Sequence, residues 1–334
     1  MIRTVILGLC LVWFIFTVFP LYWTLITSFK PPQAVSGGAT YLPWVDFTPT
    51  LKAYIDTATG VRGNFFQPVL HSAIISISAT IVSVLFGSMA AYALVRFTFR
   101  VRLLSGIIFA VIAIGGFVWL TEGFDFSPSA ALGAVFVIAV PVAVLVNRLP
   151  LPGPTLGNED VLFWFVSQRM FPPIVAAFAL FLFYSELGQE GFKTLDTYHG
   201  MVLAYTSFSL PIVIWLMRDF FQSLPLEIEE AALVDDVPRL RIFFEIVLPM
   251  SRAGLIAVSI ITVGFVWNEF LFALLLTTSD WQTLPIMLAG QNSVRGDEWW
   301  AVAVAAMVAL VPMIVLAGLL ARLMRSGLVI GAIK

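Results

Sequence analysis

Eight long apolar runs dominate this sequence of 334 residues. A helix needs about 20 apolar residues to cross the hydrocarbon core of a bilayer, and these runs reach or approach that length. Only 11% of the residues are charged, against roughly 25% in soluble proteins. We therefore expect an all-α fold, a polytopic transmembrane helix bundle. The runs are residues 4–28, 69–95, 104–121, 128–147, 161–185, 198–217, 253–277 and 299–321.

Three of these runs contain features that bear on whether each forms a single, uninterrupted transmembrane helix in the mature protein. The run 104–121 is short and contains Gly115 and Gly116, so a re-entrant segment is an alternative to a full span. Run 161–185 contains a proline pair that removes two backbone donors, which predicts a kinked or broken helix. The first run lacks a small-residue cleavage site, which favours an uncleaved anchor over a signal peptide.

The distribution of Lys and Arg predicts the sidedness of the chain, because positive residues concentrate in cytoplasmic loops. With the amino terminus inside and eight crossings, 12 basic residues fall in inside loops and 5 in outside loops. Both termini are then cytoplasmic, and residues 30–68 form the largest external segment. We expect this segment to be an irregular loop, because it is rich in Pro and Gly, with aromatic anchors at Tyr41, Trp44 and Phe47.

The same composition argues against several classes of function. A net charge of −2 without a basic patch gives no footprint for nucleic acid. The only cysteine is Cys10, and His71 and His199 are far apart, so no metal site is predicted. None of the lysines follows a glycine-rich phosphate loop. We therefore expect no cofactor, and no nucleotide bound by this chain through that motif.

A polar stretch at residues 227–249 interrupts the apolar pattern and reads EIEEAALVDDVPRLRIFFEIVLP. We call it the charged segment; the sidedness argument places it in the cytoplasm. Ala231 and Ala232 allow close backbone approach, while the surrounding carboxylates keep the other side of a helix hydrated. A long polar segment between membrane spans of a strongly hydrophobic chain indicates that a soluble partner docks there.

Three pieces of the charged segment, in order, resemble the coupling loop of binding-protein-dependent ABC importer permeases. They are Glu230–Ala231–Ala232, Asp235–Asp236, and Ile246–Val247–Leu248–Pro249. Other pieces resemble the carbohydrate branch of that family, the maltose, trehalose and polyol importers, and they follow the family's order over nearly the whole chain. These pieces are AAYAL at 90–94, SQRM at 167–170 before Pro172 and Pro173, LDTY at 195–198, Leu210–Pro211, WNEF at 267–270, TLP at 283–285, and the tail 327–334.

The resemblance implies an ABC importer type I permease fold and a transport subunit rather than an enzyme. It would import a carbohydrate or polyol across the bacterial cytoplasmic (inner) membrane by alternating access. The implied partners are two cytoplasmic ATPase subunits that bind the ATP, a second related permease, and an external solute-binding protein docking on loops that include 30–68 and 278–298. The implied ATPase-coupling residues are Glu230, Ala231, Ala232, Asp235, Asp236, Leu248 and Pro249.

Within this set the resemblance assigns separate roles. Glu230 is expected to contact a groove of the ATPase, and Asp235 to hold the shape of the loop. The tail at 331–334 is expected to reach the ATPase interface. Asp236 stands where the family has glycine; aspartate tolerates positive φ better than most residues, so the bend can survive. Pro238 is suited to start the next helix.

A second departure is the number of spans, because the family members compared have six in this type of subunit. About 103–160 is an insertion that holds two additional apolar runs. A pair of crossings returns the chain to the same side, so the later topology is preserved. We therefore divide the chain into an anchor helix with its external loop at 1–68 and a permease domain at 69–334 that contains the inserted helical hairpin.

Glu269 lies well inside an apolar run, where an ionised carboxylate costs roughly 3 kcal/mol. Two interpretations stay open: Glu269 lines the transport route, with Trp267 offering a stacking face for a sugar, or it ties two helices by hydrogen bonds. Gln168, Pro172 and Asn268 complete the tentative pathway set. For Arg169, we expect the long side chain to reach back to the cytoplasmic surface.

Two other classes of function compete with the importer. A secondary transporter would use Glu269 as the residue that carries a coupling proton, and its uptake would survive ATP depletion. A membrane-embedded enzyme is poorly supported, because no cluster of His, Cys or carboxylates indicates a metal or nucleophile site. The many Phe and Leu positions are expected to face membrane lipid or neighbouring helices.

Overall fold

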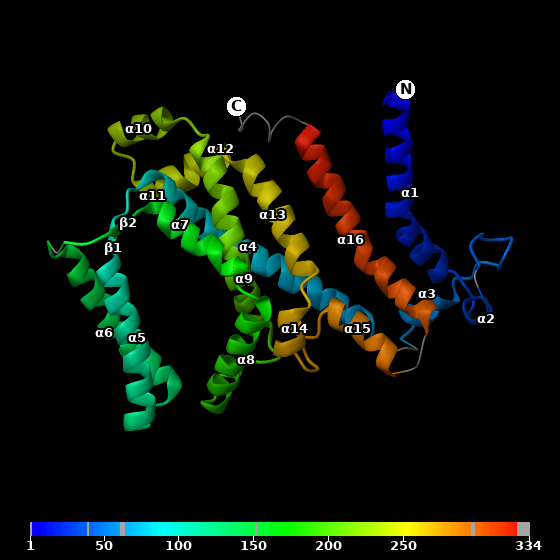
Figure 1. The fold of residues 1–334 in the computed structure, drawn as a ribbon, viewed down its shortest axis with the longest axis horizontal. Helices are drawn as coiled ribbons and strands as arrows, with labels where there is room; N and C mark the ends of the chain where they lie inside the picture. Colours follow the sequence, from blue (N-terminus) through cyan, green and yellow to red (C-terminus); the bar gives the residue numbers. More distant parts are fainter. Residues whose placement is uncertain (1, 39, 61–63, 151, 295–297, 326–334) are drawn as a thin grey trace. The chain divides into compact units, whose positions relative to one another are not determined.

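The computed structural model describes residues 2–38, 40–60, 64–150, 152–294 and 298–325 (Figure 1). Over these residues the chain is mostly helical, as predicted. It divides into two compact units. The first comprises Met1–Ile74 with Gln282–Leu319, and the second comprises Ile75–Trp281 with Leu320–Lys334. The sequence-based boundary near residue 68 stays a prediction.

The first unit contains an apolar helix, α1, that is exposed along most of its length. Its side chains are suited to contact lipid. The start of α4 is joined to the start of α15: the Leu284 N–H donates to the Ser72 hydroxyl at 2.8 Å. The helices with residues in this unit are α1 (Ile2–Ser28), α2 (Pro32–Ser36), α3 (Lys52–Ala58), α4 (Phe66–Arg96), α15 (Leu284–Val294) and α16 (Trp299–Arg325).

The segment 30–68, which we expected to be an irregular external loop, contains the helices α2 and α3 and is tied by a buried lysine. The ammonium group of Lys30 donates to the Thr40 carbonyl at 2.7 Å and lies 4.0 Å from the centroid of the Trp23 ring. Of the three expected aromatic anchors, Phe47 is buried, whereas the other two are exposed. Residues 39 and 61–63 lie outside the described part of the loop.

The second unit holds the remaining helices and the one two-stranded sheet found in the described residues. Its elements after α4 are β1 (Val101–Arg102), α5 (Leu103–Phe124), α6 (Pro128–Arg148), β2 (Thr155–Leu156), α7 (Asn158–Ser167), η1 (Gln168–Met170), α8 (Pro173–Gln189), α9 (Tyr198–Gln222), α10 (Leu226–Val234), α11 (Arg239–Ile242), η2 (Phe243–Val247), α12 (Leu248–Met250), α13 (Arg252–Trp267) and α14 (Leu271–Leu276).

The prediction of about eight spans is confirmed. Six described helices have the length and composition of a span, and two bent pairs bring the number to 8 if each pair is one span. The run at 104–121 forms the continuous helix α5, which removes the re-entrant alternative. The run at 161–185 is broken, as its proline pair predicts: its two helical parts, 158–170 and 173–189, meet at 91°.

The run at 253–277 is not one helix, and here the sequence-based prediction is wrong. α13 ends at Trp267, and α14 begins at Leu271. The Asn268 side-chain amide donates to the Gly264 carbonyl at 2.8 Å, while the Glu269 carboxylate accepts from backbone groups of α14. Polar side chains that bond to nearby backbone groups compete with the helix, which explains the interruption.

The inserted residues form a hairpin of α5 and α6, which we call the inserted hairpin. Ala131, Val135 and Ala139 recur every fourth residue on α6 and are buried, and Val135 packs against Gly116 of α5. Small residues in such a seam let two membrane helices approach closely. The turn contains Asp125, which has a left-handed φ of 52°. β1 and β2 pair in antiparallel fashion and close the other end.

The core of the second unit lies where α4, α7, α9 and α13 meet the charged segment. Tyr92 of α4 stands 5.0 Å from Phe243 of the charged segment, between ring centroids, and 6.0 Å from Phe221 of α9. The charged segment therefore packs against α4 and α9 and is not a detached loop. The buried core residues are Ala91, Tyr92, Leu94, Leu162, Val213, Ile214, Met217, Phe221, Ile242, Phe243, Val247 and Val258.

Candidate functional site

The charged segment forms a short helix, a bend, and then a chain of short helical turns. α10 ends at Val234 and is followed by Asp235 as its C-cap and by Asp236, which adopts a φ of 56°. The N–H of Val237, one residue later, donates to the Ala232 carbonyl at 3.1 Å, which closes the end of the helix. Aspartate thus takes the left-handed position that glycine would fill. The Asp235 side chain is exposed beside it.

The second half of the segment begins at Pro238, the residue that caps α11. η2 then has the wide hydrogen-bonding pattern of a π-helix, and it leads into Leu248 and Pro249 of α12. Proline cannot donate to an α-helical ladder, so a local rearrangement before Pro249 is expected. The chain then turns by 79° between Met250 and Arg252 to enter α13.

A buried ion pair fastens α10 to the end of α4. Glu229 is 5% exposed. Its carboxylate accepts from the Tyr92 hydroxyl and from the Arg96 Nε, both at 2.7 Å. The same guanidinium donates to the carbonyls of Phe221 at 3.1 Å and Leu224 at 3.3 Å. One cation therefore joins three elements: α4, the end of α9, and α10.

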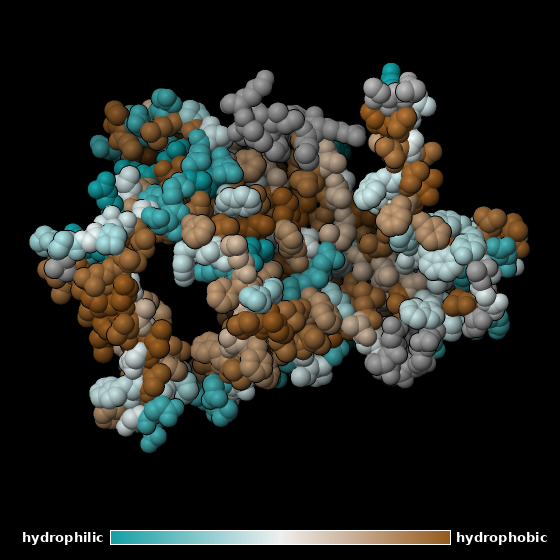
Figure 2. Space-filling view, viewed as in Figure 1, coloured by the Kyte–Doolittle hydropathy of each residue, from teal (hydrophilic) through white to brown (hydrophobic). Residues whose placement is uncertain are grey.

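The opposite face of α10 is open to solvent. Glu230, Ala231 and Val234 are exposed, and Val234 is 82% exposed. Leu240, beyond the bend, is 66% exposed. This surface therefore combines exposed carboxylates with two exposed apolar side chains, Val234 and Leu240. Figure 2 shows this mixture of polar and apolar residues over the α10 region.

Sequence reasoning placed Glu230 in the site but missed Glu229, Arg96 and Tyr92. A signal for Glu229 existed. Positions 229, 232 and 233 share one helix face, and the other two are Ala232 and Leu233, which pack against the core. A carboxylate on that inner face requires a cationic partner. Nothing in the pattern identifies Arg96 as that partner, because it lies 133 residues away.

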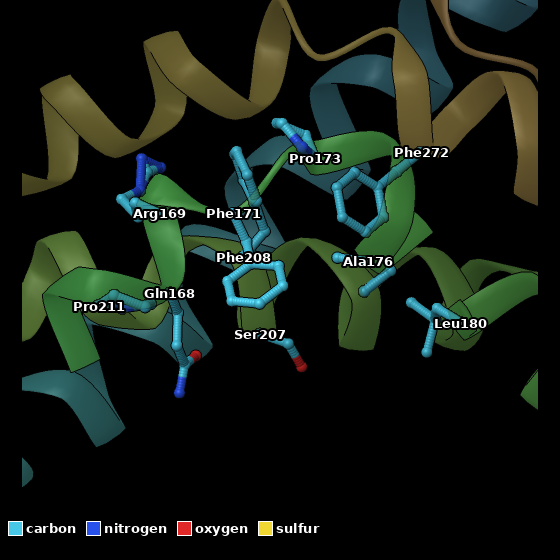
Figure 3. A pocket seen from close by; sticks show the side chains of 11 residues that line it. Gln168, Arg169, Phe171, Pro173, Ala176, Leu180, Ser207, Phe208, Pro211 and Phe272 are labelled. Atoms are coloured by element: carbon cyan, nitrogen blue, oxygen red, sulfur yellow. The ribbon is translucent and has the colours of Figure 1, made fainter. Parts of the chain in front are cut away.

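The tentative pathway residues Gln168 and Pro172 lie beside a cavity of about 240 Å³ at the break between α7 and α8 (Figure 3). Gln168 is in the cavity wall, and Pro172 caps α8. In the view of Figure 3, the side chains of Gln168 and Ser207 point to one side and that of Arg169 to the other. The wall residues are Gln168, Arg169, Phe171, Pro173, Ala176, Leu180, Ala204, Ser207, Phe208, Pro211 and Phe272.

Arg169 does not reach back to the surface, so that prediction is wrong. Its guanidinium lies 4.5 Å from the centroid of the Phe208 ring and 5.5 Å from that of Phe265. Its Nε is buried and has no hydrogen-bond partner among the residues that the structure describes. Aromatic faces on α9 and α13 hold the cation instead.

The other tentative pathway residues gather at the break between α13 and α14. The Glu269 carboxylate accepts from the N–H groups of Leu271 at 2.9 Å and Phe272 at 3.1 Å, and Tyr205 of α9 donates to the Glu269 carbonyl at 3.5 Å. These bonds favour the interpretation in which Glu269 ties helices. Trp267 is only 6% exposed, so its ring offers no stacking face in this conformation. Asn268 is exposed.

A second anchor, also missed from the sequence, holds the far end of α9. Asp196, before α9, has a left-handed φ of 53°. Its carboxylate accepts from the Thr278 hydroxyl and from the N–H groups of Ser279, Asp280 and Trp281, at 2.7 to 2.9 Å. Burial raises the pKa of Asp196, but these hydrogen bonds outweigh it and hold the pKa well below its usual value.

Comparison with known proteins gives a consistent result. The sequence model of the family described as "Binding-protein-dependent transport system inner membrane component" matches residues 158–328. This range contains the charged segment, both breaks and Asp196, and it begins after the inserted hairpin.

Relatives resemble the chain over most of its length. The "Trehalose/maltose transport system permease protein MalG" of Thermococcus litoralis is 26% identical over 96% of this chain and 92% of its own. A "Probable ABC transporter permease protein" of Sinorhizobium fredii is 32% identical over 66% of this chain and 79% of its own. The "Diacetylchitobiose uptake system permease protein NgcG" of Streptomyces coelicolor is 28% identical, with coverages of 92% and 81%.

Among solved structures, a chain of a bacterial ABC transporter involved in the import of the acidic polysaccharide alginate matches with a TM-score of 0.60. The identity is 16%, and the match covers 96% of this chain and 94% of that chain. At this identity the likeness shows a shared fold.

Proposed function

The chain belongs to the family of binding-protein-dependent transport system inner membrane components, and from that membership we propose that it is the permease subunit of an ATP-driven importer for a carbohydrate or polyol. It is a transport component rather than an enzyme. The cargo class rests on the names of relatives, which include permeases for trehalose, maltose and diacetylchitobiose.

The observation that carries the proposal is the two-sided character of α10. Its inner face is fixed by the Glu229–Arg96 pair, and its outer face presents Glu230, Ala231 and Val234. A helix that only connected two spans would need neither a buried ion pair nor exposed apolar residues. A helix that binds a cytoplasmic ATPase subunit and moves with it needs the ion pair to attach it to the spans and the exposed residues to contact the ATPase.

The mechanical path runs from this helix into the membrane spans. A push on Glu230 and Val234 moves α10, and the rigid Glu229–Arg96 contact carries the displacement to α4. The Arg96 bonds to the Phe221 and Leu224 carbonyls carry it to the end of α9. Phe243 and Val247 pack into the same core, so α13 follows across the bend at Ser251. Rocking of these spans gives alternating access.

The remaining partners follow from family membership. Two ATPase subunits bind the ATP, a second related permease completes the pathway, and an external solute-binding protein docks on loops at 30–68 and 278–298. The arginine distribution supports a cytoplasmic location for the charged segment and both termini. The tail at 331–334 and residues 295–297 lie outside the described residues, so the roles expected for them stay predictions.

A secondary transporter that uses Glu269 for protons is not proposed. The Glu269 carboxylate accepts two backbone hydrogen bonds at the start of α14, a structural role that accounts for an acidic residue at this position.

Charge reversal at the exposed face tests the proposal. Glu230→Lys is expected to insert normally, because the side chain is exposed, yet to lose ATPase co-purification or solute uptake by at least tenfold. Glu122→Lys, an exposed acid at the far end of α5, is the matched control and is expected to retain both. Normal ATPase co-purification together with normal uptake in Glu230→Lys would contradict the proposed role of this face in coupling to the ATPase.

A further inference from the structure

A cavity of about 470 Å³ lies within the first unit, and the proposed transport mechanism does not use it. One face of α1 contributes Trp23 and Thr27 to its wall, and Lys30 follows just after the helix. One face of α16 contributes Trp299 and Ala303, and α2 adds a further part. These elements meet at the end of α1 that is far from the amino terminus (Figure 1).

The Lys30 side chain is a buried cation in this wall, since the residue is only 3% exposed. Its ammonium group can donate several hydrogen bonds, but among the described residues it donates one, to the Thr40 carbonyl, and lies over the Trp23 ring. The charge of Asp46 acts on it, but that carboxylate already accepts from two backbone N–H groups. Burial lowers the pKa of Lys30, and an anion beside it would favour the charged form.

Thr27 is the second polar group that the protein leaves unsatisfied. The residue is 7% exposed, and its hydroxyl has no hydrogen-bond partner among the residues that the structure describes. Thr24, also in the wall, donates its hydroxyl to the Pro20 carbonyl at 2.9 Å. The free polar groups of the cavity are therefore a cation and a hydroxyl, and the described wall contains no carboxylate. They fit a ligand group that accepts hydrogen bonds and is negatively charged.

The rest of the wall is largely apolar. It includes Val35 of α2 and Val302 and Ala303 of α16. A sugar has hydroxyl groups around its ring, and most of them would find no partner against this wall. The cavity therefore fits a ligand that has one anionic group and is otherwise apolar.

The cavity lies where two candidate spans meet the membrane boundary. The span in α1 ends at Ser28, and the span in α16 begins at Trp299. Lysine stems and tryptophan rings are typical of this boundary, where the lipid headgroups lie. Trp299 is 48% exposed, so the cavity is not sealed beside its ring.

We propose that this cavity binds an anionic phospholipid. Lys30 and Thr27 donate to the headgroup phosphate, and the glycerol and the first acyl carbons lie against Val302 and Ala303. The bond from Lys30 to the phosphate is charge-assisted, which makes it the strongest single contact. With the orientation of the proposed function, the lipid comes from the external leaflet.

Lipid titration of the intact complex tests the site. The full-length protein is purified in detergent with its co-purifying subunits and titrated with phosphatidylglycerol, phosphatidylcholine or sn-glycerol 3-phosphate, and native mass spectrometry measures the first bound molecule. Lys30→Met removes the charge but keeps a long side chain beside Trp23, and Thr27→Val removes only the hydroxyl. Lys52→Met is the matched control, because Lys52 is an exposed lysine of α3 in the same unit.

Wild type is expected to bind phosphatidylglycerol about fivefold more tightly than phosphatidylcholine, because the choline cation is repelled by Lys30. Lys30→Met is expected to weaken phosphatidylglycerol binding roughly tenfold and Thr27→Val about threefold. Lys52→Met is expected to stay within about twofold of wild type. Should Lys30→Met fail to fold, Thr27→Val decides, since its hydroxyl has no described protein partner to lose.

Equal binding of the two phospholipids, or unchanged binding in Thr27→Val, overturns the site. Binding of sn-glycerol 3-phosphate as tight as that of phosphatidylglycerol assigns the cavity to a soluble phosphate and overturns the lipid. Cryo-electron microscopy density for a polypeptide side chain in the cavity of the intact complex does the same. None of these results depends on ATPase binding or uptake, so the site and the proposed transport function fail separately.

Discussion

The charged segment and the inserted hairpin are attached to the same core in different ways. The charged segment is bonded through its middle: Glu229 meets Arg96 and Tyr92 inside the protein, and Phe243 and Val247 pack among the core side chains. Among the described residues, the hydrogen bonds that attach the hairpin lie at its ends, at Asn158 and Glu190. A segment fixed along its length transmits a displacement to the core, whereas a segment held at its ends transmits less.

The two kinds of attachment predict different costs in stability when a side chain is removed. The inward side chains of the charged segment, such as Glu229, Phe243 and Val247, are close-packed or ion-paired, so removing one leaves a cavity or an unpaired buried charge. Side chains on the hairpin mostly face outward, so the same type of change costs little. Matched substitutions in the packed body of the second unit and in the hairpin therefore distinguish the two kinds of attachment. The four below run from the largest expected effect to the smallest.

Arg96→Met removes the cation that serves Glu229. We expect a loss of about 3–5 kcal/mol in the free energy of unfolding, because a carboxylate is left buried and unpaired. Arg148→Met at the base of the hairpin is expected to change it by less than about 0.5 kcal/mol in detergent without added lipid. Denaturant unfolding of the purified protein measures both.

The double variant Arg96→Met/Glu229→Leu serves as the control for the ion pair. Removing both charges is expected to recover most of the loss, since no charge then remains buried. If Arg96→Met and Arg148→Met unfold at the same denaturant concentration, the charged segment is no more firmly attached than the hairpin.

Asp196→Asn weakens the outer anchor of α9, and we expect a loss on the order of 2 kcal/mol, because charge-assisted hydrogen bonds are replaced by neutral ones. The matched change in the hairpin, Glu190→Gln, affects a half-exposed acid that receives one backbone N–H, and is expected to cost under about 1 kcal/mol. Thermal unfolding in detergent compares the two.

The Asp196 effect also has a predicted pH dependence. Its pKa is lower in the folded protein than the unfolded value of about 4. Its contribution to stability is therefore full above that value and is lost as pH falls toward the folded pKa. The difference in the free energy of unfolding between wild type and Asp196→Asn should be constant above about pH 5 and shrink below about pH 4. A gap that widens on acidification would contradict the anchor.

Gly254→Ala tests close packing beside the charged segment. A Cβ at Gly254 would lie 2.5 Å from the ring of Phe220, on α9, so α9 and α13 must move apart. We expect a loss of about 1–3 kcal/mol. The measurement is the unfolding midpoint of the purified protein, and an unchanged midpoint would mean that the two helices are not in close contact.

Gly133→Ala is the same substitution in the hairpin, where nothing lies within 4 Å of the added carbon. The expected effect is small and opposite in sign: a gain of up to about 1 kcal/mol, because alanine favours a helix more than glycine does. A loss comparable with that of Gly254→Ala would show that the outer surface of the hairpin is packed.

Features set by neighbouring residues could be predicted from the sequence. The apolar runs give the spans, Pro172 and Pro173 give the 91° break, and Asp236 takes the turn position because its tolerance of positive φ is a local property. The exposed Glu230 face follows from the same local pattern. Each of these needs no knowledge of distant residues.

Features set by distant residues could not be predicted. Glu229 meets Arg96 across 133 residues, and Asp196 meets residues more than 80 positions later. Arg169 turns inward because Phe208 and Phe265 happen to flank it, which helical spacing does not reveal. The end of α13 at Trp267 depends on a side chain folding back to Gly264, which hydropathy does not reveal.

The most direct test of the central claim is site-specific photo-crosslinking in the intact complex, with a photoreactive residue at Val234 and, separately, at Val137 of the hairpin. We expect Val234 to link to an ATPase subunit and to be labelled only from the cytoplasmic side, while Val137 links to lipid and to no ATPase subunit. A Val234 residue that links to no other protein, or that a membrane-impermeant reagent labels from outside the cell, would contradict the account.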